Sequence, residues 1–365
     1  MKILQLIQRP QLRGAEIFAS QLSQNLAKAG HDVVLVTLFA GEASLPFSGT
    51  LIPLNRPVNK RIIDWDGWKA FSKLVDTMQP DIVQANAGDT LKFAVLSKFF
   101  FGWKAKIVFR NANMVSDFVK SAPKRLFNRF LVSHVDYVIS VSELCRQDFI
   151  TTYSYRPDKN KTKPIGIEIS PMQDNPAGLP ELFQSDVVLI HAASFVPEKN
   201  HAGLLRIFKL LNQHVHGVKL ALLGDGRLRT RIEQQVSELG LQDHVSFLGY
   251  RKDAKACMKE AFALLLPSLI EGLPGVILEA MYCKTPVVAY DVGGIREVIV
   301  NKETGWLVKK NDETGFVNAV LEVLRGDNVD RITDNAYTRV VNEFDNAVIA
   351  RRFEEIYYKL INKHG

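Results

Sequence analysis

Short apolar runs alternate with amphipathic segments along the N-terminal half of the chain. The runs are rich in Val, Ile and Leu, which is typical of strands covered on both faces. Between the first two runs, Ile17, Phe18, Leu22 and Leu26 recur at helical spacing. The expected elements are strands at Ile3–Ile7, Val33–Leu38, Ile82–Gln84, Lys106–Phe109 and Tyr137–Ser140, and a helix at Ala15–Ala29. Strands that alternate with helices predict parallel pairing in a doubly wound sheet.

This alternation lapses between about residues 153 and 182 and then starts again. Prolines at positions 157, 164, 171, 176 and 180 lie among polar residues there, which is typical of a linker. The expected elements after it are strands at Val187–Ala192, Lys219–Leu223, Val245–Leu248, Ala263–Leu266 and Pro286–Tyr290, and helices at His201–Leu211, Leu228–Leu239, Asp253–Glu260 and Val276–Cys283. The pattern therefore predicts a second sheet of the same type.

An amphipathic segment near the C-terminus predicts one more helix. Its apolar residues recur at helical spacing from Asn346 to Leu360, so one face should pack on a domain surface. We expect an N-terminal domain at residues 1–168, a second domain at 169–345, and a terminal helix at 346–365 that packs back on the first domain. The expected fold class is α/β, with two Rossmann-like doubly wound domains facing a cleft. Such sheets bind ligands outside the carboxyl ends of their strands.

The composition is that of a soluble globular protein in a reducing compartment. Hydrophobic residues make up 47% and charged residues 23%, and no apolar stretch is long enough to span a bilayer. The N-terminal apolar run fits a buried strand better than a secretion signal, because it ends at Arg9-Pro10. Cys145, Cys257 and Cys283 are widely spaced, so neither a disulfide framework nor a metal site is indicated. A cytoplasmic location is therefore expected.

The net charge of +7 is concentrated in one segment. Between Gly88 and His134, nine Lys or Arg residues outnumber two acidic ones. Aromatic residues are interleaved with these cations in Leu91–Lys106 and Phe118–Phe130. One interpretation is that the Lys92–Arg129 region contacts an anionic membrane surface; the other is that the aromatic residues are core and the lysines are merely solvated. Nucleic acid is not expected, because nothing resembles a recognition helix or an aromatic RNA platform.

The segment from Pro267 to Arg296 carries the most specific chemistry. Glu271 precedes a Gly-Leu-Pro-Gly turn, and a helix is expected to begin at about Gly275 or Val276. Unpaired N–H groups at a helix start bind phosphate, and glycine allows close backbone approach. Glu279, one turn into the helix, can accept hydrogen bonds from a diol such as ribose. On spacing alone, an acidic residue favoured by the helix dipole explains the pattern equally well.

This segment resembles the donor site of the retaining glycosyltransferases of family four, which have the glycosyltransferase-B fold. The spacing of Glu271 and Glu279, followed by Pro-Val-Val-Ala and Gly293-Gly294, carries the likeness. The resemblance implies that Glu271 contacts hydroxyl groups of the transferred sugar and that Glu279 holds the ribose. The intervening backbone is then expected to contact the diphosphate or the sugar. The residues of that backbone are Gly272, Leu273, Pro274, Gly275 and Val276.

Further motifs of the same family follow in the same order along almost the whole chain. Arg13-Gly14-Ala15-Glu16 resembles a Gly-Gly-Ala-Glu loop that faces the donor. Phe195–Asn200 resembles the segment whose lysine pairs with the donor phosphates, and Phe247–Tyr250 resembles a strand end near the nucleotide base. The expected donor contacts from these motifs are Gly14, Gly249 and Tyr250, with Lys199 in a catalytic role beside Glu271. Each motif alone is weak evidence for the resemblance, whereas their shared order along the chain is strong evidence.

The phosphate-binding motif departs from the family pattern at one position. Ser194 stands where the family usually has an arginine that joins Lys199 on the phosphates. Ser194 is still expected at the donor, where it can donate one hydrogen bond but brings no charge. Either Lys199 acts with backbone groups alone, or Arg227 or Arg251 substitutes for the missing cation.

Two further departures lie in the N-terminal half. Arg13 replaces the first glycine of the loop motif and is a surface residue or reaches the diphosphate or an anionic acceptor. Relatives often place a histidine near residue 110, where this chain offers Asn111 and Asn113 as acceptor-side candidates, although asparagine is also common in turns. Asp64-Trp65-Asp66 has the D-x-D form of metal-dependent enzymes, but Asp64 is better placed to cap a helix. No metal site is expected, because the histidines show no ligand spacing.

The sequence therefore predicts a metal-independent, retaining hexosyltransferase without a cofactor. Its donor is expected to be a nucleoside-diphosphate sugar, UDP rather than GDP, and its acceptor a hydroxyl of a glycan or lipid-linked glycan in polysaccharide biosynthesis. It is expected in the cytoplasm, or peripherally at the inner face of the cytoplasmic membrane. Two alternatives stay open: a non-catalytic sugar-nucleotide or glycan-binding subunit, for which Ser194 and the missing histidine speak, and a UDP-sugar epimerase. The intact pair of glutamates argues against the first.

Overall fold

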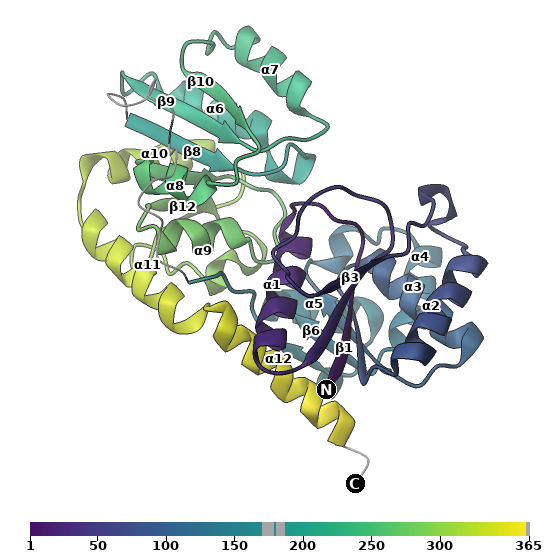
Figure 1. The fold of residues 1–365 in the computed structure, drawn as a ribbon. Helices are drawn as coiled ribbons and strands as arrows, with labels where there is room; N and C mark the ends of the chain where they lie inside the picture. Colours follow the sequence, from purple (N-terminus) through teal and green to yellow (C-terminus); the bar gives the residue numbers. More distant parts are fainter. Residues whose placement is uncertain (170–178, 180–186, 363–365) are drawn as a thin grey trace. The chain divides into compact units, whose positions relative to one another are not determined.

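The chain forms two compact units, each built around one parallel sheet (Figure 1). The computed structural model describes residues 1–169, 179 and 187–362. Unit 1 combines Met1–Glu168 with Asp345–Gly365, and unit 2 consists of Ile169–Phe344. Most of the C-terminal part of the expected linker, residues 170–178 and 180–182, lies outside the described residues. The two sheets with alternating helices confirm the fold class of two Rossmann-like domains.

Unit 1 contains seven parallel strands in the order β3-β2-β1-β4-β5-β6-β7. They are β1 (Lys2–Ile7), β2 (Asp32–Thr37), β3 (Thr50–Pro53), β4 (Ile82–Ala85), β5 (Lys106–Asn111), β6 (Tyr137–Ser140) and β7 (Asn160–Thr162). The strand order reverses at β1, which pairs with β2 on one side and with β4 on the other. The loops that leave β1 and β4 therefore diverge, and doubly wound sheets bind ligands at such a switch point.

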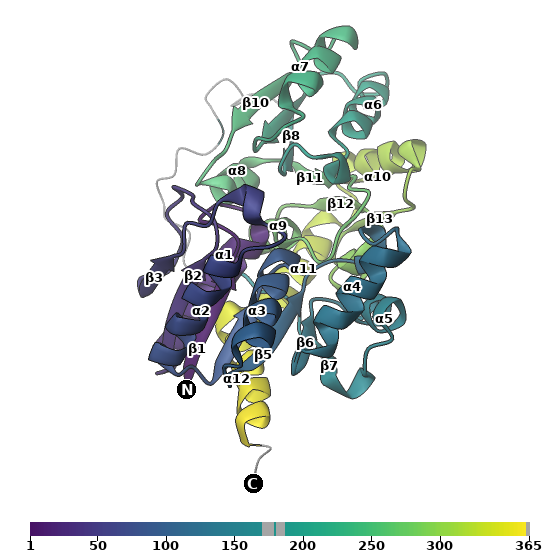
Figure 2. The same ribbon diagram turned by 90° about the vertical axis from the view of Figure 1, so that its right-hand side faces the viewer.

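Helices cover both faces of the sheet in unit 1 (Figure 2). They are α1 (Gly14–Lys28), α2 (Trp65–Met78), α3 (Gly88–Phe101), α4 (Ala122–Ser133), α5 (Glu143–Tyr153) and α12 (Asn346–Ile361). The helices α1 and α12 pack together, with the rings of Phe18 and Phe353 5.9 Å apart. On the other face, Leu4 and Leu6 of β1 share a large core with residues of α2 and α3, including Phe71.

The terminal helix α12 is held on unit 1 by polar contacts at both ends. Asp345 caps its first turn, and the N–H of Asn346 donates to the carbonyl oxygen of Ile167 at 3.0 Å. Near the other end, the buried hydroxyl of Tyr357 donates to the side-chain oxygen of Gln84 in β4. A buried polar side chain needs such a partner, so these contacts fix how α12 is seated. The terminal helix thus packs on the N-terminal unit, as the sequence predicts.

Unit 2 contains six parallel strands in the order β10-β9-β8-β11-β12-β13. They are β8 (Val187–Ala192), β9 (Val218–Leu223), β10 (Val245–Gly249), β11 (Ala263–Leu266), β12 (Val287–Tyr290) and β13 (Trp306–Val308). The helices are α6 (His201–Leu211), α7 (Arg229–Glu238), α8 (Ala254–Glu260), α9 (Gly275–Tyr282), α10 (Glu313–Arg325) and α11 (Val329–Glu343). The switch point lies between β8 and β11, so the loops that leave these two strands are the expected ligand-binding loops.

The expected strands and helices are present, with ends that coincide with the prediction or differ from it by one or two residues. The sequence analysis missed three strands, β3, β7 and β13, which are three or four residues long. Each lies at an edge of its sheet, where one neighbour and partial exposure remove the long apolar run that marks a central strand. It also missed the helices α10 and α11 after residue 312.

Candidate functional site

The loops that leave β8 and β11 are bonded to each other at the carboxyl edge of the sheet in unit 2. Leu269 donates its N–H to the carbonyl oxygen of Glu198 at 2.8 Å. Asn200 has a left-handed backbone, caps α6 with its side-chain oxygen, and donates its amide to the carbonyl oxygen of Pro267 at 3.0 Å. The side chain of Asn200 thereby links the start of α6 to the loop that follows β11. The two loops therefore form a single rigid edge.

Lys199 and Glu271 meet across these two loops. The Nζ atom of Lys199 lies 2.5 Å from Oε1 of Glu271. The Glu271 side chain is 7% exposed and that of Lys199 is 23% exposed, so the pair is largely shielded from water. Such shielding strengthens the attraction and makes either charge costly to leave unpaired. A lysine ammonium carries three donors, so the bond to Glu271 leaves Lys199 able to bind a phosphate as well.

The backbone of Glu271 is held by a glycine pair that follows β12. Gly293 has a φ of +54°, and a Cβ there would lie 1.8 Å from the carbonyl oxygen of Glu271. The N–H of Gly294 donates to the carbonyl oxygen of Gly272 at 2.7 Å. Only glycine permits both the left-handed backbone and this close approach. The Gly293-Gly294 motif of the sequence thus sets the position of the loop that carries Glu271.

The turn after Glu271 leads directly into α9, which begins at Gly275 after Pro274 at its N-cap. The first N–H groups of a helix have no partner within it, and the dipole makes this end attractive to an anion. Glu279 is partly buried one turn into α9, and burial raises its pKa, opposed by the charge of Lys255. The half-exposed Tyr250, just after β10, is close enough for Glu279 to raise its pKa in addition to burial. The structure therefore brings the predicted donor residues of unit 2 together.

The two cations that could substitute for the missing arginine differ in their contacts. Ser194 lies partly buried in the loop after β8. Arg251 donates to both carboxylate oxygens of Asp253, at 2.7 and 2.5 Å, so its charge is already engaged. Arg227 is exposed in the loop after β9. Of the two cations that the sequence suggested as substitutes, Arg227 is thus the one with its charge open to solvent.

Two buried histidines beneath the loop after β8 were missed by the sequence analysis. His201 stacks on Phe195 at 4.0 Å between ring centroids, and its ring lies 4.6 Å from that of His191. Burial lowers the pKa of His191 to about 4 and lowers that of His201 further. Both rings are therefore neutral at pH 7, and Nδ1 of His191 donates to the carbonyl oxygen of Leu265 at 2.7 Å. The charge of Lys199 also lowers both pKa values, so the two uncharged rings lie near that lysine. Only their place next to the lysine motif could have indicated them.

In unit 1, the expected acceptor-side residues differ in their surroundings. Arg13 is exposed at the N-cap of α1, and nothing lies within 4 Å of a Cβ built on Gly14. Asn113 is exposed in the loop after β5. The turn interpretation of Asn111 is wrong, because it is the last residue of β5 and its buried amide donates to Ser140 and to the carbonyl oxygen of Cys145. Arg13 and Asn113 thus present free surface, whereas the Asn111 amide is committed internally.

Two buried charged residues of unit 1, Arg110 and Glu16, were also missed. Arg110 in β5 is 3% exposed, its guanidinium lies 4.3 Å from the ring centroid of Phe18, and its Nε and Nη1 atoms have no hydrogen-bond partner. Burial lowers its pKa to about 10, while the charge of Glu16 raises it. Burial raises the pKa of Glu16, against a hydrogen bond from Gln11 and the charges of Arg13 and Arg110. An arginine within an apolar strand was the signal that could have marked this position.

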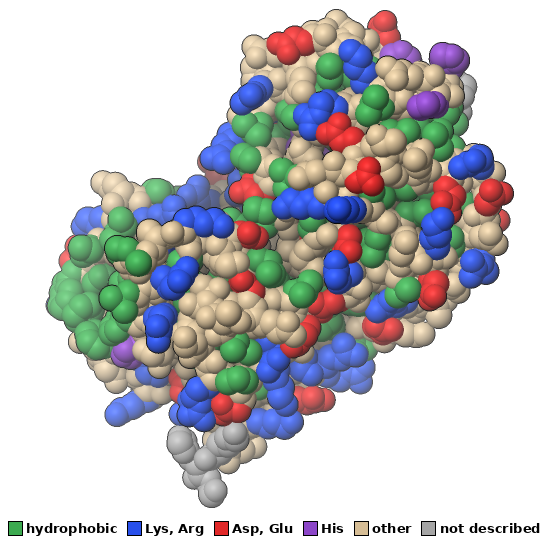
Figure 3. Space-filling model, turned by 180° about the vertical axis from the view of Figure 1, so that it is seen from behind, with side chains coloured by type: hydrophobic (Ala, Val, Ile, Leu, Met, Phe, Trp, Pro, Cys, Tyr) green, Lys and Arg blue, Asp and Glu red, His purple; other side chains and the backbone are tan. Residues whose placement is uncertain are grey.

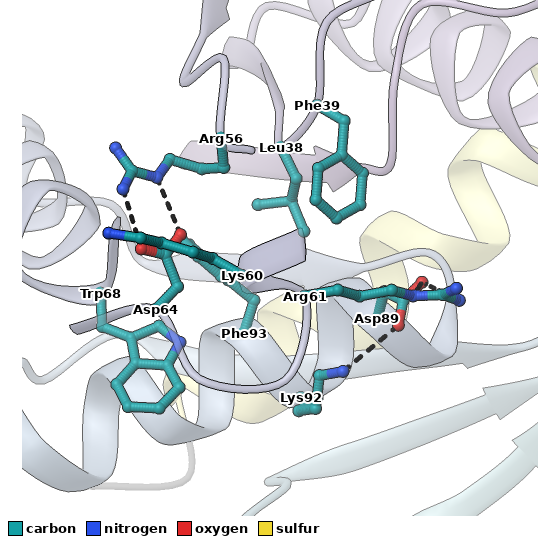
Figure 4. A pocket seen from close by; sticks show the side chains of 10 residues that line it. All are labelled: Leu38, Phe39, Arg56, Lys60, Arg61, Asp64, Trp68, Asp89, Lys92 and Phe93. Atoms are coloured by element: carbon teal, nitrogen blue, oxygen red, sulfur yellow. Dashed lines mark hydrogen bonds and ion pairs between the residues drawn. The ribbon is translucent and has the colours of Figure 1, made fainter. Parts of the chain in front are cut away.

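Asp64 lines a pocket of unit 1 together with Arg56 and Asp89, as Figure 4 shows. Asp64 caps α2 by accepting from the N–H of Gly67 at 3.1 Å, which confirms the capping prediction. Arg56 donates twice to its carboxylate, at 2.8 Å each. Burial opposes ionisation of Asp64, but the Arg56 and Gly67 hydrogen bonds outweigh it and lower the pKa. Nearby, Asp89 accepts from both Arg61 and Lys92. Across the described residues, no group of three or more His, Cys, Asp or Glu is arranged to hold a metal ion.

The basic and aromatic region is divided by the structure into core and surface. Phe93 and Trp103 are buried, as the core interpretation expects. Phe99, Phe100 and Phe130 are exposed. The core interpretation therefore holds for Phe93 and Trp103 but not for Phe99, Phe100 and Phe130. Among the described helices, none combines the length and the apolar character needed to cross a membrane.

Comparison with known protein families gives a match for each half of the chain. Residues 12–170 match the model "Glycosyltransferase Family 4", and residues 180–339 match "Glycosyl transferases group 1". The chain belongs to the family 4-type glycosyltransferases. It is 26% identical over 383 residues to N-acetyl-alpha-D-glucosaminyl L-malate synthase of Bacillus anthracis, covering 98% of this chain and 97% of the relative. The two matched models support glycosyl transfer as the activity of this chain.

Other relatives and solved structures agree with this family. A Campylobacter jejuni N-acetylgalactosamine-N,N'-diacetylbacillosaminyl-diphospho-undecaprenol 4-alpha-N-acetylgalactosaminyltransferase is 25% identical over 265 residues, 71% of each chain. The structure of Anabaena HepE in complex with UDP-glucose has a TM-score of 0.83 and 22% identity, and covers 98% of this glycosyltransferase and 100% of HepE. At that identity the structural likeness shows the fold alone, which is of the glycosyltransferase-B type.

Proposed function

We propose that this glycosyltransferase moves a hexose-type sugar from a UDP-sugar to a hydroxyl group of a glycan or lipid-linked acceptor, with retention of the anomeric configuration. The observation that carries the proposal is the shielded pair of Lys199 and Glu271 beside the N-terminus of α9. It joins a cation, a sugar-binding carboxylate and a helix start at the switch point of one sheet. UDP rather than GDP is supported by the UDP-glucose in the HepE structure.

The donor is proposed to bind along the edge of unit 2. The N–H groups at the start of α9 and the ammonium of Lys199 hold the diphosphate, with Ser194 as a further donor. Glu279 accepts from the ribose hydroxyls, and Tyr250 lies against the base. Glu271 accepts from hydroxyl groups of the transferred sugar while its other oxygen keeps Lys199 oriented. Each role uses the chemistry of the side chain and its place on the same sheet edge.

The chemical step depends on stabilising the departing diphosphate. Negative charge develops on the β-phosphate as the bond to the sugar breaks, and Lys199 with the α9 N-terminus is fixed where that charge appears. These groups do in this proposal what a divalent cation does in metal-dependent enzymes, so transfer is metal-independent. The acceptor hydroxyl gives its proton to the leaving phosphate on the same face of the sugar. Retention follows, because attack and departure share that face.

The acceptor is proposed to bind to the domain of residues 1–168, and the donor to that of residues 169–345. Exposed Arg13 and Asn113 lie at loops that follow β1 and β5, the edge where doubly wound sheets bind ligands. A lipid-linked acceptor is supported by the Campylobacter jejuni relative, whose name specifies a diphospho-undecaprenol acceptor. Such an acceptor puts the protein at the inner face of the cytoplasmic membrane, as a peripheral protein.

The proposal is tested by slow hydrolysis of nucleotide-sugars by the purified full chain. A panel of UDP- and GDP-sugars is incubated with the wild type and with Glu271→Ala, and released nucleoside diphosphate and the anomer of the sugar are measured. We expect UDP release with retained configuration, lost in Glu271→Ala and kept in the control Glu198→Ala, whose partly buried carboxylate lies in the neighbouring loop. Binding without any turnover would instead support the non-catalytic subunit, and a changed sugar still bound to UDP would support the epimerase.

A further inference from the structure

Three segments of unit 1 present large apolar side chains to solvent. They are the stretch before α2 with the first residue of that helix, the end of α3, and the segment from Phe118 through α4. Ile62 is 71%, Leu126 70% and Trp65 52% exposed. The full set, called the aromatic surface below, is Val58, Ile62, Ile63, Trp65, Phe99, Phe100, Phe118, Leu126, Phe127 and Phe130. Single exposed apolar residues are ordinary, but a contiguous group of them marks an interaction site.

Ring contacts join the three segments into one surface. Trp65 lies 5.1 Å from Phe100, Phe100 lies 5.3 Å from Phe99, and Phe99 lies 5.4 Å from Phe130, between ring centroids. The chain of rings therefore runs from α2 across the end of α3 to α4. Figure 3 shows hydrophobic side chains gathered over unit 1, at the left of the view, with Lys and Arg side chains around them.

The exposure of α4 is unusual for a helix of a globular domain. Only Leu131 and Val132, both in its last turn, are buried. Leu126, Phe127 and Phe130 lie on one side of the helix, three and four residues apart, and all are exposed. An amphipathic helix normally buries its apolar face against the core. In α4 the apolar face is instead left open, so it is suited to a partner outside the chain.

The charged side chains of the α4 segment have one sign. Residues 118–135 contain Lys120, Lys124, Arg125 and Arg129, all exposed, and no Asp or Glu. Apolar side chains flanked by long cationic ones match the boundary of an anionic bilayer, where the rings enter the headgroup region and the cations reach lipid phosphates. A second copy of the same surface would bring four cations against four cations, and like charges repel at contact.

We propose that the aromatic surface docks this glycosyltransferase onto an anionic phospholipid leaflet by shallow insertion of Trp65, the end of α3 and the apolar face of α4. The proposal deepens the peripheral location in the proposed function, on which it rests, by naming the surface that makes the contact, and it uses none of the donor residues. It also corrects the extent of the predicted membrane region. The surface excludes the buried Phe93 and Trp103. It adds the residues of the aromatic surface that lie outside Lys92–Arg129, which are Val58, Ile62, Ile63, Trp65 and Phe130.

Trp65 provides a direct optical probe of insertion. The other three tryptophans, Trp68, Trp103 and Trp306, are at most 5% exposed. The full-length chain is titrated with vesicles of phosphatidylcholine alone and with equimolar phosphatidylcholine and phosphatidylglycerol. We expect a blue shift of tryptophan emission and co-sedimentation with the anionic vesicles only, both reversed by salt. In Trp65→Phe the shift should disappear while most of the co-sedimentation remains.

Two sets of variants separate the apolar and the charged contributions. Lys124→Ala, Arg125→Ala and Arg129→Ala together should weaken vesicle binding by about a hundred-fold at low salt, from the usual contribution of each cation near an anionic surface. Leu126→Gln with Phe127→Gln should abolish the blue shift. A matched control removes three exposed cations of unit 2, with Lys209→Ala, Arg231→Ala and Lys310→Ala, and should bind vesicles nearly as the wild type does. Donor hydrolysis should be unchanged in all of these variants, since none is a donor residue.

Several outcomes would overturn the docking proposal. One is no binding to anionic vesicles, or binding that salt does not weaken. Another is equal loss of binding in the two triple variants, which would indicate a general charge effect. If the wild type self-associates without lipid and the Leu126→Gln, Phe127→Gln variant does not, the surface is a contact between copies. If hydrolysis persists without vesicle binding, only the docking proposal is refuted. If vesicles bind without hydrolysis, only the proposed transfer reaction is refuted.

Discussion

Substitution of Gly293 by alanine should displace the loop that carries Glu271 without touching any side chain of the donor site. The added Cβ would lie 1.8 Å from the carbonyl oxygen of Glu271, whereas real Cβ contacts are essentially never shorter than 3.0 Å. The loop must therefore move by about 1.2 Å, the difference between these two distances. The hydrogen bond from Gly294 to Gly272 lies next to the clash and should be lost with this movement.

The expected loss in the free energy of unfolding combines three effects. Alanine in a left-handed backbone costs about 1–2 kcal/mol, and loss of the Gly294 hydrogen bond costs about 1 kcal/mol more. With the clash added, the free energy of unfolding of Gly293→Ala should fall by about 3 kcal/mol. A displacement of about 1 Å at a reacting group costs about a hundred-fold in rate, so donor hydrolysis should fall by that factor.

A second glycine isolates the effect of the clash. Gly240, after α7, has a φ of +69° but nothing within 4 Å of an added Cβ. Gly240→Ala therefore carries the same backbone strain, and it should cost about 1–2 kcal/mol with normal hydrolysis. Urea denaturation and UDP release are measured for both variants. If Gly293→Ala matched Gly240→Ala in both measurements, Gly293 would not position Glu271 and the reasoning would be wrong.

Three further predictions concern unit 1 and metal dependence. Asp64→Asn keeps the helix cap but loses the Arg56 ion pair, so the free energy of unfolding at pH 7 should fall by about 2 kcal/mol. Because the fold lowers the pKa of Asp64, this difference should vanish in urea denaturation as the pH falls below the ordinary value of 3.8, and a constant difference would contradict it. Arg110→Met combined with Glu16→Gln removes both buried charges, so the free energy of unfolding should stay equal or rise by about 1–3 kcal/mol. Arg110→Met alone leaves the buried Glu16 without its neighbouring cation and should lower the free energy of unfolding, and a marked loss in the double variant would contradict this reasoning. Removal of divalent cations with a chelator should leave donor hydrolysis unchanged, and its loss would exclude the metal-independent mechanism.

The sequence predicts the central strands well, because each is marked by a run of apolar residues within the strand itself. Strands such as β8 and β11 are continuous apolar runs buried on both faces, and their predicted bounds match the structure. The edge strand β3 reads as a loop, because it is mostly exposed and includes Pro53. In α3, apolar residues surround the helix, so the sequence could not tell the buried Phe93 from the exposed Phe99 and Phe100. That distinction depends on which neighbours cover each side of the helix.

The sequence predicts site residues that lie in one continuous motif. It does not predict contacts between residues that are far apart in the chain. The Glu271–Glu279 spacing marks the donor loop, and the structure shows this loop bonded to the Lys199 loop 72 residues earlier in the chain. The sequence could not reveal that Lys199 pairs with Glu271 itself. It also left Asn111 as a turn residue, because only the strand pairing of β5 with β6 places its amide near Ser140.

Equilibrium binding of UDP and UDP-sugars, measured by calorimetry on the full chain, tests most directly whether the Lys199–Glu271 edge is a nucleotide-sugar site. The account predicts saturable binding of one molecule per chain. Lys199→Met should weaken it by about ten- to a hundred-fold, from the loss of a charge-assisted hydrogen bond to the diphosphate. The control Lys209→Met, at an exposed position of α6, should bind as the wild type does. Absence of binding to every nucleoside-diphosphate sugar tested, or equal affinity of Lys199→Met and the wild type, would contradict the account.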